Sequence, residues 1–334
     1  MNKQERQSII MSLINEKQEI NITEITDVLN NELWEIINDF KELETEWKIE
    51  KINDWIYKLK TDLSDYFSIP FDKRPEKSYN PDFLKFYSPN ISTFLWDKYQ
   101  HIKNQYVDFN IKIEYDYNKN KKIIENIITD LSFSSSKLEW NTYTFLETEN
   151  LIKYNTYWEL KKPTETKMIL NHKNTIKYII ENKDTITLNH DNFKKIHTLL
   201  CEDLLSNEYL WEIRSYETHI AESAYYPLNN IYQLGAEYET FINKLNKIEN
   251  PFEQSLFILI FIPYLNVFTE LNNRTARICA TIPLIKKWYL PLTFLQIKDS
   301  DYTKSMLSIY ELNDVIPIRN LFINNYLINT KKYM

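Results

Sequence analysis

The chain has 334 residues, a net charge of −7 and only two cysteines. These values exclude a disulfide framework and a cysteine-based zinc site, and they argue mildly against non-specific nucleic-acid binding. The longest apolar run, residues 256–265, is too short to cross a bilayer, and the first residues lack the apolar core of a signal peptide. We therefore expect a soluble cytoplasmic protein without membrane segments, with room for a large and a small domain.

Residues 1–60 have the pattern of three helices followed by a β-hairpin. Apolar residues at helical spacing come first, and NITEITDVLNN predicts a short helix that starts at Asn21 or Thr23. A third amphipathic helix is predicted in ELWEIINDFKELETE, and KIEKINDWIYKLKT alternates like a hairpin that turns at Asn53-Asp54. This order resembles a winged-helix domain.

A winged-helix domain suggests DNA binding through its third helix. In this chain the third helix has one basic residue, Lys41, and six acidic residues, which are Glu32, Glu35, Asp39, Glu42, Glu44 and Glu46. A helix that enters a groove between phosphates should be basic or neutral. DNA binding is therefore possible but disfavoured, and we expect a protein-docking or structural role for this module.

The rest of the chain predicts a mainly α-helical fold. Residues 61–120 form an extension that packs on the core, because prolines and aromatic residues are interleaved there. Residues 121–334 form the core domain, with helices predicted at 121–131, 145–154, 164–181, 191–205, 229–247, 251–264, 274–288, 301–310 and 314–329. The exception is residues 216–227, whose pattern predicts a short β-hairpin.

One segment of the core domain carries residues suited to phosphate binding. The sequence LNVFTELNNRTARICATIPLI, residues 265–285, places NNRTAR at the start of a predicted helix. Arg274 and Arg277 lie three residues apart and therefore share one helix face, and arginine forks match phosphate oxygens. A helix N-terminus also favours anions. By themselves these residues favour a simpler interpretation, a capped helix that has two surface arginines.

The context of this segment resembles the Fic (Fido) domain family. The family motif, His-Pro-Phe-x-Asp/Glu-Gly-Asn-Gly-Arg-x-x-Arg, matches residues 266–277, and SSSKLEWNTY resembles the family's regulatory stretch. Further segments, such as KKIHTLLCEDLL, WEIR and AYYPL, follow in the expected order, so that the resemblance covers about residues 62–330. It implies a helical Fic core with a β-hairpin flap that aligns a protein target, and transfer of AMP from ATP to a protein hydroxyl.

The resemblance also implies roles for individual residues. Nucleotide binding falls to Asn272, Asn273, Arg274 and Arg277, and ATP would come with a magnesium ion on Glu270. Ser135 and Glu139 match the regulatory positions, where the glutamate pairs with the second motif arginine and obstructs the γ-phosphate.

The motif departs from the family at its catalytic position. Asn266 stands where the family has the histidine that accepts a proton from the target hydroxyl, and an amide cannot act as a general base. Leu271 and Asn273 replace the two motif glycines. Activity is therefore expected to be reduced, altered or absent, and the alternatives are a noncatalytic nucleotide-sensing regulator or a protein-interaction module.

A substitute base would have to be one of the chain's five histidines. His172 and His197 lie on predicted helices, where a core or surface role is the simpler interpretation, and no role is predicted for His101 or His190. His219 lies in the predicted flap hairpin and is the more interesting candidate.

Several tryptophans occupy places where related sequences have glycine. The chain has eight tryptophans and one glycine, whereas about 7% glycine is usual and would give roughly two dozen. The positions concerned are Trp47, Trp140, Trp211 and Trp288, together with Trp55 after the predicted turn. Drift in an AT-rich coding sequence is one explanation. The other is a reassigned UGA codon that the native cell reads as glycine.

Overall fold

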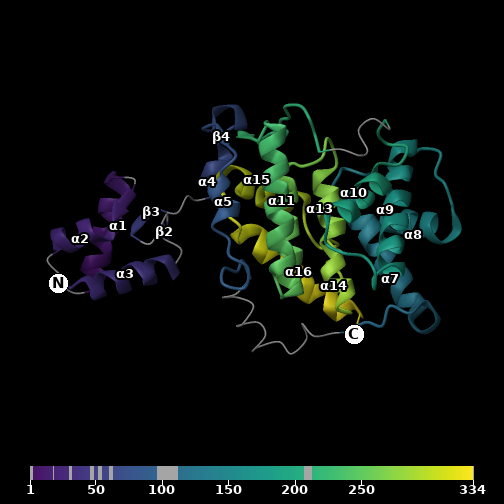
Figure 1. Cartoon of the computed structure of the whole chain (residues 1–334), viewed down its shortest axis with the longest axis horizontal. Coiled ribbons are helices and arrows are strands. Elements are labelled where there is room, and N and C mark those ends of the chain that lie inside the picture. The colour runs from purple at the N-terminus through teal and green to yellow at the C-terminus, as the bar shows by residue number, and fades with distance from the viewer. Residues whose placement is uncertain are drawn as a thin grey trace. The chain divides into compact units, whose positions relative to one another are not determined.

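The computed structural model in Figure 1 describes residues 3–17, 19–29, 32–45, 49–51, 55–59, 63–95, 112–206 and 213–333. The chain divides into two compact units, Met1–Pro70 and Phe71–Met334. Helices make up most of the described residues, which confirms the predicted mainly α fold class. Within these residues, no helix is long and apolar enough to span a membrane.

The described residues of the first unit form four helices and a three-stranded antiparallel sheet. The helices are α1 (Lys3–Lys17), α2 (Ile22–Leu29) and α3 (Leu33–Thr45), and a short α4 (Leu63–Ser68) ends the unit. The strands β1 (Glu19–Asn21), β2 (Ile49–Lys51) and β3 (Ile56–Leu59) pair in the order β1-β3-β2. Three helices and a β2–β3 hairpin were predicted, whereas β1 was not. The winged-helix assignment stays a prediction, and the turn at Asn53-Asp54 lies outside the described residues.

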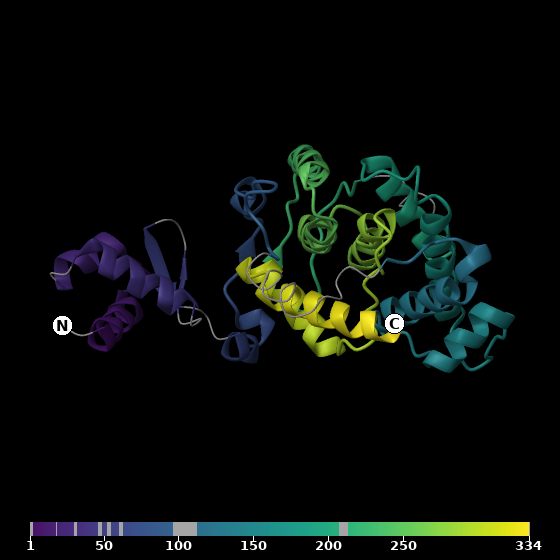
Figure 2. The same ribbon diagram turned by 90° about the horizontal axis from the view of Figure 1, so that it is seen from below.

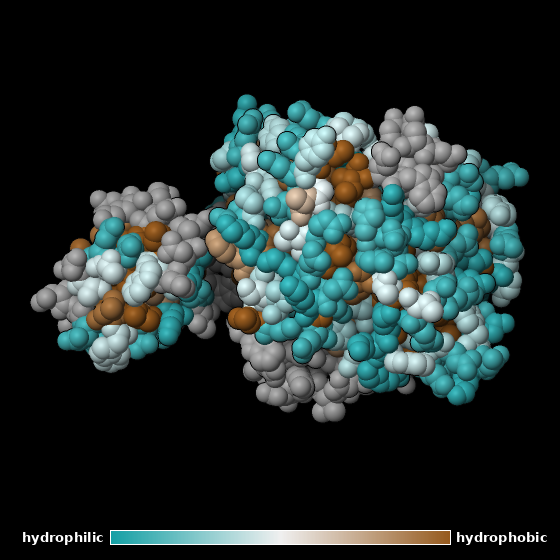
Figure 3. Space-filling view, in the orientation of Figure 1, coloured by the Kyte–Doolittle hydropathy of each residue, from teal (hydrophilic) through white to brown (hydrophobic). Residues whose placement is uncertain are grey.

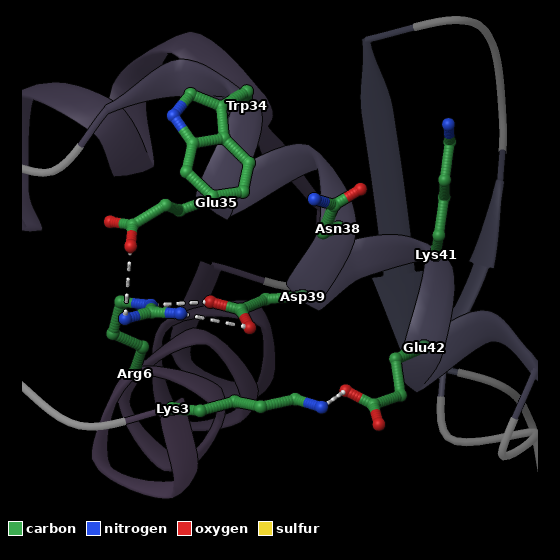
Figure 4. A pocket seen from close by; sticks show the side chains of 8 residues that line it. All are labelled: Lys3, Arg6, Trp34, Glu35, Asn38, Asp39, Lys41 and Glu42. Atoms are coloured by element: carbon green, nitrogen blue, oxygen red, sulfur yellow. Dashed lines mark hydrogen bonds and ion pairs between the residues drawn. The ribbon is translucent and has the colours of Figure 1, made fainter.

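Basic residues of α1 pair with acidic residues of α3 beside a pocket of about 530 Å³ (Figure 4). Arg6 donates from Nε to Asp39 Oδ2 (2.6 Å) and from Nη2 to Asp39 Oδ1 (3.3 Å), and Lys3 pairs with Glu42. The hydrogen bond to Asp39 raises the pKa of Arg6. Asp39 is only 1% exposed. Part of the acidic charge on α3 is thus compensated inside the unit, so the charge argument against DNA binding is weaker than residue counts suggest.

The second unit is built around the apolar helix α12 (Pro251–Leu265). The side chain of Asn250 caps its N-terminus and Pro251 occupies the first helical position, where a missing N–H costs nothing. Almost every later residue is buried, because α12 packs against helices on several sides. Its contact partners are α11 (Ile231–Lys247), α13 (Asn272–Cys279), α14 (Thr281–Lys286) and α15 (Asp299–Leu312).

The other helices complete the unit around this centre, and Figure 2 shows the long C-terminal helix in yellow. They are α7 (Tyr117–Lys137), α8 (Phe145–Tyr154), α9 (Pro163–Glu181), α10 (His190–Cys201) and α16 (Ile316–Tyr333). Helix α9 packs on α7 and on α10, and α10 contacts α13. Hydrophilic residues cover most of the visible face of this unit, with apolar residues scattered between them (Figure 3).

Residues 71–95 of the second unit lie against α12 through aromatic side chains. This segment contains η1 (Phe71–Lys73), β4 (Lys77–Ser78) and α5 (Pro81–Lys85). The ring of Phe83 lies 5.0 Å from that of Phe261, and the ring of Tyr87 lies 4.6 Å from that of Phe257. The buried carboxylate of Glu253 accepts hydrogen bonds from Tyr87, Thr93 and two backbone N–H groups. The segment therefore forms part of the core.

The helix predicted over residues 274–288 is in fact two helices, and this prediction was wrong. Helix α13 ends at Cys279 and α14 begins at Thr281, with Ala280 between them. Pro283 explains the break, because it lacks an N–H and its ring crowds the carbonyl four residues earlier. The carbonyl of Ala280, the residue between the two helices, accepts a hydrogen bond from the Ser255 hydroxyl of α12 (2.7 Å).

The hairpin predicted over residues 216–227 is also wrong. Among the described residues this segment contributes one short strand, β5 (Tyr225–Tyr226), which pairs in parallel with β4. The buried carboxylate of Glu311 fixes the pair, because it accepts hydrogen bonds from Arg74, from the Ser223 hydroxyl and from the Ala224 N–H. A partner strand so distant in sequence leaves no trace in the local pattern.

Two of the tryptophans adopt a backbone conformation that favours glycine. Trp140 has φ 63° and Trp288 has φ 68°. A bulky residue with positive φ is a genuine outlier. The expectation that position 55 favours glycine with positive φ stays a prediction, because the turn before it lies outside the described residues. Trp47 and Trp211 lie outside the described residues.

Candidate functional site

The loop between α12 and α13 begins with Asn266. This residue is left-handed (φ 50°, ψ 56°), and its N–H donates to the carbonyls of Ile262 and Pro263, which ends α12. Asparagine and histidine are among the few non-glycine residues that tolerate this conformation well. The carbonyl of Asn266 accepts a hydrogen bond from Arg214 Nε (2.6 Å). Residue 266 is therefore held in place by its backbone, whichever side chain it carries.

Asn272 closes the loop with its side chain. Its Nδ2 donates to Asn266 Oδ1 and to the Phe268 carbonyl, and its Oδ1 accepts from the Phe268 N–H. Phe268 is 1% exposed and anchors the loop by stacking on His197, with ring centroids 4.3 Å apart. His197 Nε2 also lies 3.1 Å from the Glu270 carbonyl. His197 is thus a core residue that supports the loop, and the side chain of Asn272 shapes it.

The two arginines on the first turns of α13 meet one carboxylate. Glu139 Oε1 lies 2.7 Å from Arg277 Nη2, and Glu139 Oε2 lies 3.1 Å from Arg274 Nε. Burial lowers the pKa of Arg274. Burial acts in the same direction on Arg277, but Tyr302 and Glu139 raise its pKa above the ordinary value. The predicted pairing of Glu139 with Arg277 is present, and it extends to Arg274.

Arg277 is fully buried behind this ion pair. Its Nε donates to Ser135 Oγ and its Nη2 to the Ser135 carbonyl, both at 3.0 Å, while Nη1 donates to Tyr302 (3.2 Å). The Ser135 hydroxyl also lies 3.0 Å from Nε2 of His172. Burial lowers the pKa of His172 to about 3, so this ring is neutral at physiological pH. Ser135, in the last turn of α7, therefore positions Arg277.

A pocket of about 600 Å³ lies above this network. Most of the predicted site residues line it, and these are Glu139, Asn266, Glu270, Asn272, Asn273 and Arg274. Ser135 and Arg277 do not reach its wall. Helix α15 supplies Tyr302 and Tyr310, two lining residues that carried no recognisable signal in the sequence. His219 and Glu222 line the pocket from the segment before β5.

The pocket fits a magnesium ion brought by a polyphosphate better than a protein-held metal. Glu270 is an exposed carboxylate on its wall. No cluster of three or more possible metal ligands occurs among the described residues. Magnesium commonly binds through one or two carboxylates together with phosphate oxygens and water. The pocket is lined by the carboxylates of Glu139, Glu222 and Glu270, and Glu139 is paired with the arginines, so its residues are compatible with this pattern.

Comparison with known proteins identifies the domain. Residues 187–284, which include the Asn266 loop and Arg277, match the model of the Fic/DOC family. This part of the chain is a Fic domain. No curated protein sequence matches the chain.

Solved structures of Fic proteins share the fold. A Fic family protein from Desulfovibrio desulfuricans aligns with a TM-score of 0.58 and 16% identity, over 74% of this chain and 76% of that chain. Fic-1 from C. elegans gives 0.55 and 14%, over 70% of each chain. A Fic-domain-containing signaling protein from Bacteroides thetaiotaomicron gives 0.54 and 14%, over 70% of this chain and 95% of that chain. The Fic fold thus extends well beyond the residues that the family model matches.

Proposed function

We propose that this Fic domain binds ATP with magnesium in the pocket above Arg274, and that Glu139 blocks the site in the present conformation. The proposal rests chiefly on the position of Glu139, whose two carboxylate oxygens meet Arg274 and Arg277 at the pocket wall. A carboxylate held by two arginines occupies the place where phosphate oxygens would bind, because both anions suit the same guanidinium forks.

The surroundings of Arg274 support an anionic ligand. Its side chain is only 14% exposed, and burial disfavours its charge. Among the described residues, Glu139 is its sole carboxylate partner within 4 Å. The N-terminal turn of α13 adds unpaired backbone N–H groups beside it. A phosphate would therefore stabilise this partly desolvated guanidinium more than it would stabilise a fully solvated arginine side chain.

For the reaction we propose transfer of AMP to a hydroxyl group of a protein, at a rate limited by the missing histidine. Bound magnesium would neutralise charge on the phosphates, and Glu270 would hold it. The chain's own residues do the rest: Arg274 orients the triphosphate from the pocket wall, Arg277 can join it only once Glu139 has left, and the hydroxyl arrives beside the Asn266 loop. Asn266 itself can donate or accept a hydrogen bond but cannot remove the proton.

Replacing Glu139 tests the proposal directly. Glu139→Gly frees both arginines, so calorimetric titration with ATP and magnesium should show an affinity at least about 10-fold higher than in the unmodified chain, a difference of about 1.4 kcal/mol. Glu125→Gln, on helix α7 ahead of Glu139 and away from the pocket, is the control. Equal ATP affinity in Glu139→Gly and the unmodified chain contradicts the proposal.

A noncatalytic nucleotide sensor is the second candidate, and Asn266 is the observation that favours it. Labelled ATP separates the two functions. Under the first, the Glu139→Gly variant transfers AMP, whereas under the second it binds ATP and raises the midpoint of thermal unfolding without forming product.

A further inference from the structure

We propose that His219 acts as the general base of this Fic domain in place of the missing motif histidine. The inference rests on the proposed function, and it names the residue that would make the reaction possible. It follows from the position of His219, which lines the same pocket as Asn266 and Arg274.

The other described histidines cannot take this role. His172 is fully buried, and both of its ring nitrogens face partners in the core, Ser135 and the Met168 carbonyl. His197 is buried against Phe268 beneath the loop. His190 begins α10 and packs on Tyr238, and it does not line the pocket. Of the histidines in the described part of the chain, His219 alone lines the pocket and is exposed.

The segment that carries His219 is anchored at strand β5 and at helix α15. The imidazole lies edge-on against Tyr226 of β5, with centroids 4.5 Å apart at 73°. Strand β5 is paired with β4, and Glu311 of α15 binds the residues just before β5. Helix α15 also lines the pocket through Tyr302 and Tyr310. The flap segment and the pocket wall are therefore parts of one connected structure.

Other titratable groups in the pocket suit the task less well. These groups are the carboxylates of Glu139, Glu222 and Glu270. Histidine is the side chain that most often serves as a general base near neutral pH. Glu139 is engaged by the arginines, and Glu270 is assigned to the metal. His219 is left as the group with the appropriate chemistry.

The transfer step needs only ATP, the target hydroxyl and His219. A target hydroxyl oxygen attacks the α-phosphorus of ATP, and the new oxygen–phosphorus bond forms as the bond from the α-phosphorus to the β-bridging oxygen breaks. Pyrophosphate leaves with that electron pair. The hydroxyl proton passes to the unprotonated ring nitrogen of His219, which later releases it to water.

The test uses the full chain in the Glu139→Gly background, with ATP labelled on the α-phosphate and magnesium. Label attached to the chain and free AMP are both measured, so that protein hydroxyls and water count as acceptors. Adding His219→Gln should lower AMP transfer about 100-fold or more, and it should weaken the dependence of the rate on pH, because glutamine cannot accept the proton. Adding His190→Gln, a histidine outside the pocket, should leave the rate and its pH profile unchanged.

Calorimetry of ATP binding distinguishes the two ways in which the idea can fail. If the Glu139→Gly chain does not bind ATP, the proposed function is wrong and this assignment falls with it. If ATP binds equally to the Glu139→Gly chain with and without His219→Gln, the proposed function stands. In that case, AMP transfer that is equal in both overturns the role of His219 alone, whereas AMP transfer that is absent in both overturns this role together with the proposed transfer reaction and leaves only nucleotide binding.

Discussion

Glu139 and Arg277 form an ion pair of 2.7 Å that joins the end of α7 to the first turns of α13. The guanidinium is fully buried, while 22% of the Glu139 side chain is exposed to the pocket. Glu139 therefore has two roles. It compensates the buried charge of Arg277, and it occupies the proposed anion site at the pocket wall. Removing Glu139 and removing Arg277 should have different consequences, which can be measured separately.

Loss of the Arg277 guanidinium should be costly for stability. Arg277→Met leaves Glu139, the Ser135 carbonyl and the Tyr302 hydroxyl without their donor, so we expect unfolding in urea to show a loss of about 3 kcal/mol. Arg274→Met, one turn earlier and paired only with Glu139 among the described carboxylates, should cost about 1 kcal/mol. Equal losses in the two variants would mean that Arg277 is not the structural centre of the network.

Returning a histidine to the motif should restore the usual route to AMP transfer. Position 266 has φ 50°, which histidine tolerates, so Asn266→His should change the stability by less than about 1 kcal/mol. In the Glu139→Gly background it should raise transfer of labelled AMP at least about 10-fold. It should also make that transfer independent of His219. If transfer stays unchanged although ATP binds, the side chains at Leu271 and Asn273 obstruct the phosphates.

The buried imidazole of His172 should make stability depend on pH. Its folded-state pKa of about 3 lies below the ordinary 6.5, so the unfolded chain binds this proton first as pH falls. The contribution of the neutral imidazole to the free energy of unfolding is complete above about pH 6.5. It is lost between about pH 6.5 and about pH 3, with a slope of up to about 1.4 kcal/mol per pH unit.

Urea unfolding as a function of pH measures that slope. His172→Gln should flatten the pH dependence between about pH 3 and 6.5. His219→Gln is the control, because its ring is already exposed in the folded protein. A slope that His172→Gln leaves unchanged would show that the acid sensitivity comes from carboxylates.

Glycine should stabilise two positions that tryptophan now occupies. Trp140 is 79% exposed, so Trp140→Gly loses little burial and removes a left-handed strain of about 1–2 kcal/mol. Trp288→Gly should gain less stability, since the Trp288 ring is 39% exposed and Lys183 lies over it. The midpoint of thermal unfolding should rise in both.

The same positions test the hypothesis of a reassigned codon. We expect mass spectrometry of peptides from the native cell to show glycine at 140 and 288. Tryptophan masses there would leave compositional drift as the explanation and the strain as a property of the native chain.

The secondary structure was largely predictable because most helices carry their own signals. Helix α8 has the predicted bounds, and its Thr144–Glu147 capping box is visible in the sequence. Helix α12 could be recognised from its apolar run and from Pro251. The break at Ala280 was missed because the signal of Pro283 competes with a continuous apolar pattern. Strand β1 and the β4–β5 pair were missed because their partners lie far along the chain.

By itself the sequence determined the motif, its missing histidine and the family resemblance, because these depend on residue types in order. Only the tertiary structure decided how they act together. It placed Glu139 against both arginines, committed the side chain of Asn272 to the loop, and buried Arg277 beneath the pocket rather than within it. It also brought His219 to the pocket that Asn266 lines. Such relationships arise from packing between segments more than a hundred residues apart or on different elements, and no local pattern contains them.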